Sequence, residues 1–89
     1  PTISRFFGII IRIFTETGVQ HHAPHIHVYY QENSAVYRID TIELIAGDLL
    51  VVSVDFVEAW MELYQDELLE NWRLANDGQV VNQIPPLQR

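Results

Sequence analysis

Four histidines stand within seven consecutive positions of this 89-residue chain, and they are all the histidines it has. They occur in the stretch HHAPHIH, as His21, His22, His25 and His27. An imidazole can bind a transition metal, exchange a proton near neutral pH, or make hydrogen bonds as donor and acceptor. Because the chain has no cysteine, thiolate chemistry and disulfides are excluded. We therefore expect any metal or acid–base chemistry to centre on this stretch.

The spacing of the last three histidines suits a metal site. His25 and His27 stand two apart on a predicted strand, so their imidazoles are expected on one face. His22 precedes Pro24, whose fixed φ stiffens the approach to the strand, and it could supply a third ligand. Three protein ligands with one position left for water are typical of catalytic zinc sites. One interpretation is therefore a divalent-metal site, with zinc as the candidate ion, on His22, His25 and His27.

Other interpretations of the histidine cluster remain open. Histidines that face solvent on a strand can serve polar recognition or proton transfer, and they can be purely structural. A histidine-triad nucleotide hydrolase needs a third alternating histidine, but Ala23 occupies that position. A free N-terminal proline can act as a general base, yet removal of an initiator methionine explains Pro1 more simply. The sequence leaves open whether the chain is an enzyme.

Charge is divided unevenly along the chain, whose formal net charge is −7. Residues 1–39 carry three arginines against two glutamates, whereas residues 40–89 carry ten acidic residues against two arginines. An acidic surface repels phosphate backbones, which argues against a free-standing nucleic-acid binder. The same surface suits a basic partner protein.

Length and composition predict a single domain over residues 1–89. A chain of this size can bury one core and little more, and 48% of its residues are hydrophobic. No apolar run approaches the roughly 20 residues that span a bilayer, and the start lacks the basic segment of a signal peptide. We therefore expect a cytoplasmic protein without a membrane partner. The apolar first strand also suggests assembly into a homo-oligomer.

Hydrophobic patterning predicts an α+β fold in which a small, mainly antiparallel sheet of three to four strands packs against one long C-terminal helix. β-Branched and aromatic residues mark the strands, and apolar residues at steps of three and four mark the helix. The expected elements are strands over 3–15, 25–31, 35–40 and 42–45, a helix from an N-cap at Ser53 to a C-cap at 76–78, and an extended tail over 79–89.

Several motifs together resemble a small bacterial family of unknown function. They are Pro1-Thr2-Ile3, Gly8-Ile9-Ile10-Ile11-Arg12, His22-Ala23-Pro24-His25-Ile26-His27, Glu67-Leu68-Leu69-Glu70-Asn71-Trp72 and Ile84-Pro85-Pro86-Leu87. The chain departs from the family at Ala23, where a proline is usual, and at Tyr64, where a histidine often stands. The resemblance implies a bacterial origin and an association with toxin–antitoxin-like operons, and it implies no established reaction.

Two functions follow from these observations. The first is a protein-interaction component of a toxin–antitoxin-like module, whose partner is encoded next to it and contacts a sheet edge or the histidine face. The acidic half and the operon context favour this function. The second is a metal-dependent hydrolase or nuclease that uses His22, His25 and His27. The histidine cluster favours it, and the negative charge disfavours it.

Overall fold

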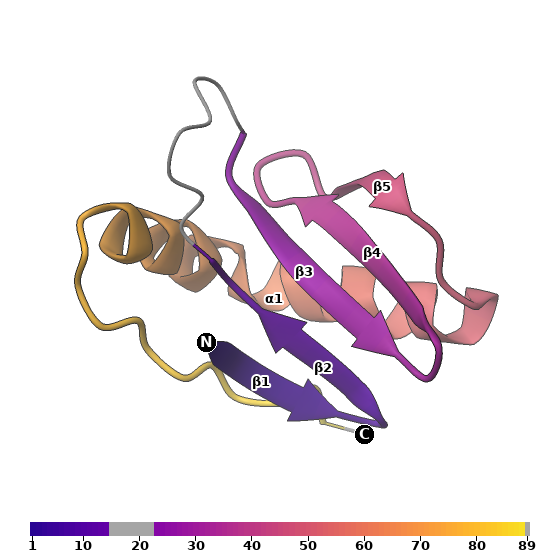
Figure 1. Ribbon diagram of the computed structural model, residues 1–89. Helices are drawn as coiled ribbons and strands as arrows, with labels where there is room; N and C mark the ends of the chain where they lie inside the picture. The colour runs from indigo at the N-terminus through magenta and orange to yellow at the C-terminus, as the bar shows by residue number, and fades with distance from the viewer. Residues whose placement is uncertain (15–22, 89) are drawn as a thin grey trace.

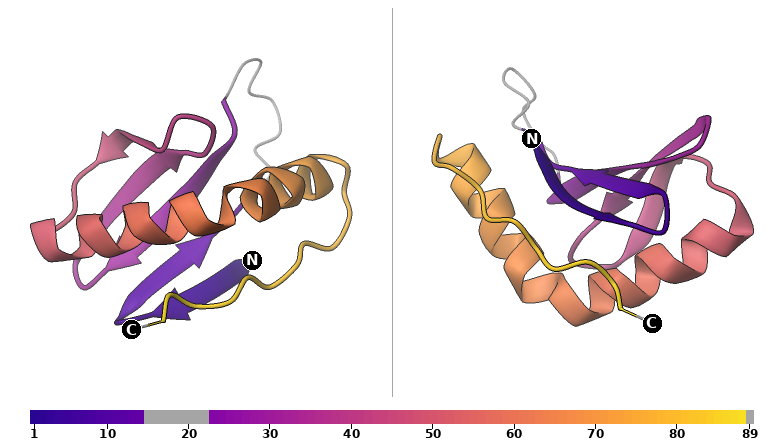
Figure 2. Two further views of the ribbon diagram at one scale, coloured as in Figure 1. Left: turned by 180° about the vertical axis from the view of Figure 1, so that it is seen from behind. Right: turned by 90° about the horizontal axis from the view of Figure 1, so that it is seen from below.

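The computed structural model describes residues 1–14 and 23–88. Within these residues, five strands form one antiparallel sheet in the order β1-β2-β3-β4-β5, and one helix follows them. The elements are β1 (Thr2–Phe6), β2 (Ile9–Arg12), β3 (His25–Tyr30), β4 (Asn33–Arg38), β5 (Glu43–Gly47) and α1 (Val51–Asn76). The helix crosses one face of the sheet, and the chain then returns along β1 (Figures 1 and 2). The α+β class is confirmed, but the sheet has five strands instead of three to four.

The additional strand arises at the N-terminus, where the single strand expected over 3–15 proves to be a hairpin. The chain reverses at Phe7 and Gly8, whose φ angles are 51° and 80°. Positive φ at both central residues is typical of a two-residue type I′ turn, and Gly8 adopts it without steric cost. β1 then pairs with β2, with Phe6 opposite Ile9. The expectation was wrong because apolar residues flank the turn on both sides and hide it.

The core lies between α1 and the side of the sheet that faces it. Alternate residues of β2 and β3 are fully buried there, namely Ile9, Ile11, Ile26 and Val28. Trp60 of α1 is fully buried against them. The opposite side of the sheet, which we call the open face, points away from α1 (Figure 2). Apart from the contact of Trp72 of α1 with His25 at one end, none of the described helices or strands packs on the open face.

The helix begins earlier than expected and ends where expected. Leu50, in an extended conformation, is the N-cap residue, three positions before the predicted cap at Ser53. Ser53 instead lies in the first turn, where its Oγ donates a hydrogen bond to the carbonyl oxygen of Leu50 (2.7 Å). Asn76 is the last helical residue, and Gly78 follows with a φ of 71°. At Tyr64 the backbone leaves helical geometry (φ −117°, ψ 22°), and α1 bends.

Nowhere in the described part of the chain does a helix combine the length and the apolar character that crossing a membrane requires.

Candidate functional site

The structure places His25 and His27 on the same side of β3. Their ring centroids are 5.3 Å apart, and their planes meet at 65°. The intervening Ile26 and the following Val28 are fully buried on the other side, as the predicted alternation requires. His22, the third predicted ligand, and His21 lie outside the described residues. The described part of the predicted site is thus one pair of neighbouring imidazoles.

The distance between these two rings suits ligands of one metal ion. Zn–N bonds of about 2.0–2.1 Å at a tetrahedral angle place two imidazole centroids about 5 Å apart. Nδ1 of His25 lies 2.8 Å from the carbonyl oxygen of Ala23. If Nδ1 donates there, this bond fixes the orientation of the ring, as such hydrogen bonds do for metal-binding histidines. The described residues include no group of three or more His, Asp or Glu that could hold a metal ion.

Aromatic rings surround both histidines and limit access to them. The ring of Trp72 on α1 lies 4.8 Å from that of His25, and the ring of Phe14 lies 5.0 Å from that of His27. His25 is only 6% exposed, and Nε2 of the half-buried His27 is inaccessible to solvent. The histidines therefore stand at an aromatic, mostly dry end of the sheet and not on a freely hydrated strand.

Arg12 and Tyr29 join the histidines on the open face, and the sequence alone did not assign them a role. The register between β2 and β3 sets Arg12 opposite His27. The guanidinium carbon of Arg12 lies 5.2 Å from the centroid of the Tyr29 ring, which is a cation–π distance. Nε of Arg12 also donates a hydrogen bond to Oγ1 of Thr2 (3.2 Å). The signal that could have found Arg12 is its charge at an alternate position of an otherwise apolar strand.

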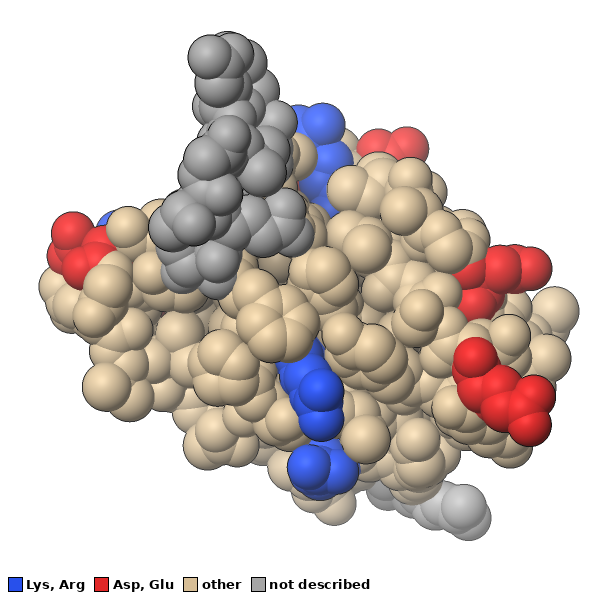
Figure 3. Space-filling view, viewed as in Figure 1, with Lys and Arg blue, Asp and Glu red and all other residues tan. Residues whose placement is uncertain are grey.

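Charge separates the two sides of the molecule. Strands β1–β4 contain three arginines and no carboxylate, whereas α1 contains six carboxylates and one arginine. Figure 3 shows arginine atoms towards the middle of the open face and carboxylates near its margin. Arg38 donates two hydrogen bonds to Asp40 (2.5 and 2.9 Å), and this contact lowers the pKa of the Asp40 carboxyl. The charges of Arg5 and Arg12 have no such carboxylate partner among the described residues.

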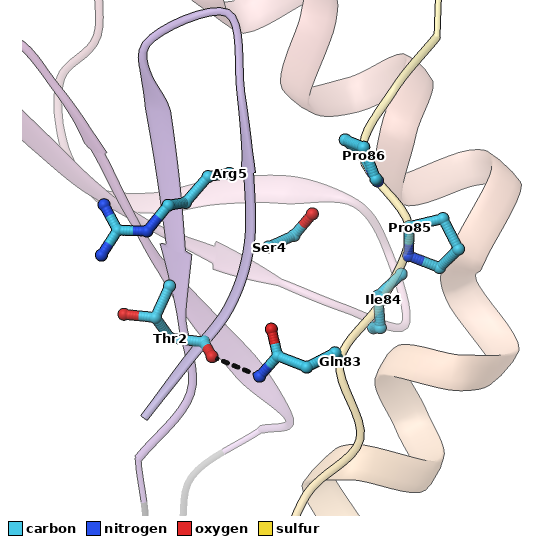
Figure 4. A pocket seen from close by; sticks show the side chains of 7 residues that line it. All are labelled: Thr2, Ser4, Arg5, Gln83, Ile84, Pro85 and Pro86. Atoms are coloured by element: carbon cyan, nitrogen blue, oxygen red, sulfur yellow. Dashed lines mark hydrogen bonds between the residues drawn. The ribbon is translucent and has the colours of Figure 1, made fainter.

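The C-terminal tail (residues 79–88) covers the β1 edge of the sheet. The amide of Ile84 donates to the carbonyl oxygen of Ile3 (2.9 Å), and the indole N–H of Trp60 donates to the carbonyl oxygen of Pro85 (2.9 Å). A hollow of about 600 Å³ remains between β1 and the tail, and Gln83 bridges it through a hydrogen bond to Thr2 (Figure 4).

The β5 edge, at the other side of the sheet, is uncovered. All five residues of β5 are exposed, and β5 has no neighbour beyond β4 among the described strands. Leu44 is 44% exposed and Ile45 is 53% exposed. The start of α1 adds the exposed apolar residues Val51 and Val52 a few positions along the chain. The most exposed apolar surface of the sheet is therefore on an open strand edge. The histidine cluster in the sequence gives no indication of this edge.

Comparison with known proteins gives a family without an assigned activity. No curated protein and no solved structure matches the chain. The model of a family described as a domain of unknown function (DUF4160) matches residues 8–73. The matched range includes the histidine pair, Arg12 and the β5 edge, while β1 and the tail lie outside it. Because the match covers most of the sequence, the chain belongs to the DUF4160 family.

Proposed function

We propose that this protein is the interaction component of a toxin–antitoxin-like pair and that its partner protein adds a strand to β5. The observation that carries the proposal is the difference between the two sheet edges: the chain covers β1 with its own tail and leaves β5 open. An exposed strand edge presents unpaired main-chain N–H and C=O groups on which another chain can pair. Strand addition supplies affinity through main-chain hydrogen bonds and specificity through alternate side chains.

The residues of β5 specify the chemistry of the partner strand. Leu44, Ile45 and Ala46 form an uncharged centre, with Glu43 at one end and Asp48 just past the other. A complementary strand carries apolar residues in its middle and lysine or arginine near its ends. A second copy of this chain, paired antiparallel about Ile45, would bring two more carboxylates to the same ends. A basic partner protein is therefore favoured over a homo-oligomer at this edge.

Co-expression with the product of the adjacent reading frame tests this proposal. Ile45→Lys places a charge on the open edge, and Leu63→Lys, at a 64% exposed position of α1, is the matched control. Burial of one isoleucine contributes about 1.5–3 kcal/mol, so we expect Ile45→Lys to weaken the complex at least about tenfold. The Leu63→Lys variant is expected to keep wild-type affinity.

Two results would contradict the proposal. If the chain purifies alone from the co-expression, the product of the adjacent reading frame is not its partner. If Leu63→Lys abolishes the complex and Ile45→Lys does not, the interface is on the helix and not on β5. Hydrogen exchange gives an independent check, because the amides of residues 43–47 are expected to gain protection only in the complex.

A second candidate function, a metal-dependent hydrolase or nuclease, is favoured by the 5.3 Å separation of the His25 and His27 rings. In this function the two imidazoles and His22 would bind zinc, and the remaining position would hold water for hydrolysis. Calorimetric titration of the untagged chain with zinc tests it. We expect one ion per chain at micromolar or tighter affinity, lost in the double variant His25→Ala, His27→Ala and kept in His21→Ala. Equal losses in both variants would indicate adventitious binding only.

A further inference from the structure

A cation stacked on an aromatic ring occupies the middle of the open face. The guanidinium of Arg12 lies over the ring of Tyr29 at 5.2 Å, and its bond to Thr2 holds the arginine along the sheet. Both side chains are half-buried, so part of each remains accessible. A tyrosine ring that carries a guanidinium on one side can stack an unpaired nucleobase on its other side, while the guanidinium contacts a phosphate.

A second cation stands next to this stack. Arg5 lies opposite Ile10, two residues from Arg12 along β2, so the two Cα atoms are diagonal neighbours about 7–8 Å apart. Arg5 is exposed, makes no ion pair with another described residue, and extends over the sheet and away from the tail (Figure 4). No carboxylate in strands β1–β4 separates the two guanidinium groups. Two adjacent cations on a flat face suit consecutive phosphates of one strand.

A small hollow adjoins the stack on its other side. It measures about 250 Å³ and is lined by the rings of His27 and Tyr29 and by the small residues Ser34, Ala46 and Gly47. Pockets for drug-sized ligands start at about 300 Å³, so this hollow suits one ring system. The hydroxyl groups of Tyr29 and Ser34 provide polar groups for the edge of a base.

We propose that the open face binds a short single-stranded nucleic-acid segment, with one base in this hollow and the flanking phosphates on Arg12 and Arg5. The net charge of the whole chain, −7, overstates the electrostatic repulsion that a phosphate meets at the open face. Six of the carboxylates belong to α1, on the far side of the sheet. An acidic peptide would use the two cations but would leave both rings without a stacking partner, so nucleic acid is the better match.

Fluorescence anisotropy with a labelled ten-nucleotide oligouridine tests the proposal. Two phosphate contacts to a single strand predict a slope of about −1.4 for log K against log salt, which is about a sevenfold loss from 50 to 200 mM. Loss of one stacking ring in Tyr29→Leu is expected to weaken binding about tenfold. Arg5→Gln and Arg12→Gln are each expected to weaken binding and to halve the salt slope.

The controls separate this site from general charge effects. Arg73→Gln removes the same charge from α1 and is expected to leave the affinity unchanged. Because Arg5 has an exposed side chain, its substitution tests the site even if Arg12→Gln fails to fold. Equal binding of an RNA duplex would overturn the stacking model, and tighter binding of oligoglutamate would assign the face to an acidic peptide. If no binding is detected at 50 mM salt, the proposal of nucleic-acid binding is wrong, and the separate proposal of a partner strand at β5 is not affected.

Discussion

Both edge strands of the sheet contain large apolar residues, but the chain covers one edge and leaves the other open. At β1, Ile3 is fully buried and its carbonyl oxygen accepts a hydrogen bond from Ile84 of the tail. At β5, Ile45 is 53% exposed and no described strand lies beside it. Covering an edge removes a row of unpaired backbone groups that would otherwise pair with other chains. The small size of the sheet therefore does not explain why β5 is open, because the same chain covers the β1 edge.

The tail is held against the β1 edge at specific points. Asn71 of α1 is fully buried and binds Asn82 twice, with its amide nitrogen donating to the carbonyl oxygen and its amide oxygen accepting from the backbone N–H, each at 2.8 Å. Trp60 binds the carbonyl oxygen of Pro85 three residues later along the tail. Side chains of the helix thus hold the tail in the place where a sixth strand would pair with β1. Within residues 1–14 and 23–88, no segment covers β5 in this way.

Removal of residues 83–89 is expected to have the largest effect on this contrast. The deletion exposes β1 and removes the burial of Ile84, worth about 1.5–3 kcal/mol. It also breaks the hydrogen bonds that join Ile84 to Ile3 and Trp60 to Pro85, worth about 1 kcal/mol each, together with the exposed bond from Gln83 to Thr2. We expect urea unfolding to show a loss of about 4 kcal/mol and size-exclusion chromatography to show association through β1. Deletion of residues 88–89 alone is the control. Unchanged stability of the longer deletion would show that the tail does not protect β1.

The next largest effect is expected at Gly47, which lets β5 lie against β4. Its φ is 76°, and a Cβ atom there would stand 2.2 Å from the carbonyl oxygen of Ser34. Gly78 is the matched control because its φ is 71° and a Cβ would meet nothing within 4 Å. We expect Gly47→Ala to lower the free energy of unfolding by about 3–4 kcal/mol and Gly78→Ala by about 1–2 kcal/mol. Equal losses measured in urea would mean that β5 can move away from β4 without cost.

Periodicity predicted the elements that have one apolar face, and it failed where both faces are apolar. Alternation along β3 correctly separated Ile26 from His25 and His27, because one side of that strand faces the core. The residues before and after Gly8 carry no such contrast, so the hairpin turn was missed and a strand was not counted. The cap at Ser53 was also wrong, because a serine in the first turn can bond the preceding carbonyl instead of capping the helix.

Only the part of the candidate site that lies on a single strand could be predicted from the sequence. The pairing of Arg12 with Tyr29 depends on the register between β2 and β3, and the contact of Trp72 with His25 depends on where α1 crosses the sheet. Neither the strand register nor the position of the helix can be derived from the spacing of residues within one segment. The open β5 edge could not be predicted either, because it is open only in contrast to a tail that covers the other edge.

A smaller loss of stability is expected from Asn71→Ala, which loosens the tail without shortening it. The substitution leaves the backbone N–H and carbonyl oxygen of Asn82 without their partner, and we expect a loss of about 2 kcal/mol in urea unfolding. Asn76→Ala is the control, since Asn76 is exposed and donates only to the carbonyl oxygen of Trp72. If both variants lose the same stability, the clamp at Asn82 contributes nothing specific to the covered edge.

The smallest effect is expected at Tyr37, whose partner across the ladder is Leu44 of the open edge. Burial, and secondly the carboxylate of Glu58, raise the pKa of the Tyr37 hydroxyl above its usual value of 10. A raised pKa in the folded state means that this contribution to stability is complete below pH 10 and is lost as the pH rises through the folded pKa. The free energy of unfolding measured in urea is therefore expected to fall above pH 10 in the wild type and in Tyr30→Phe. In Tyr37→Phe the decline should be smaller, with stability at pH 8 kept within about 1 kcal/mol because the buried hydroxyl has no hydrogen-bond partner among the described residues. An identical decline in Tyr37→Phe would show that β4 admits water next to the uncovered edge.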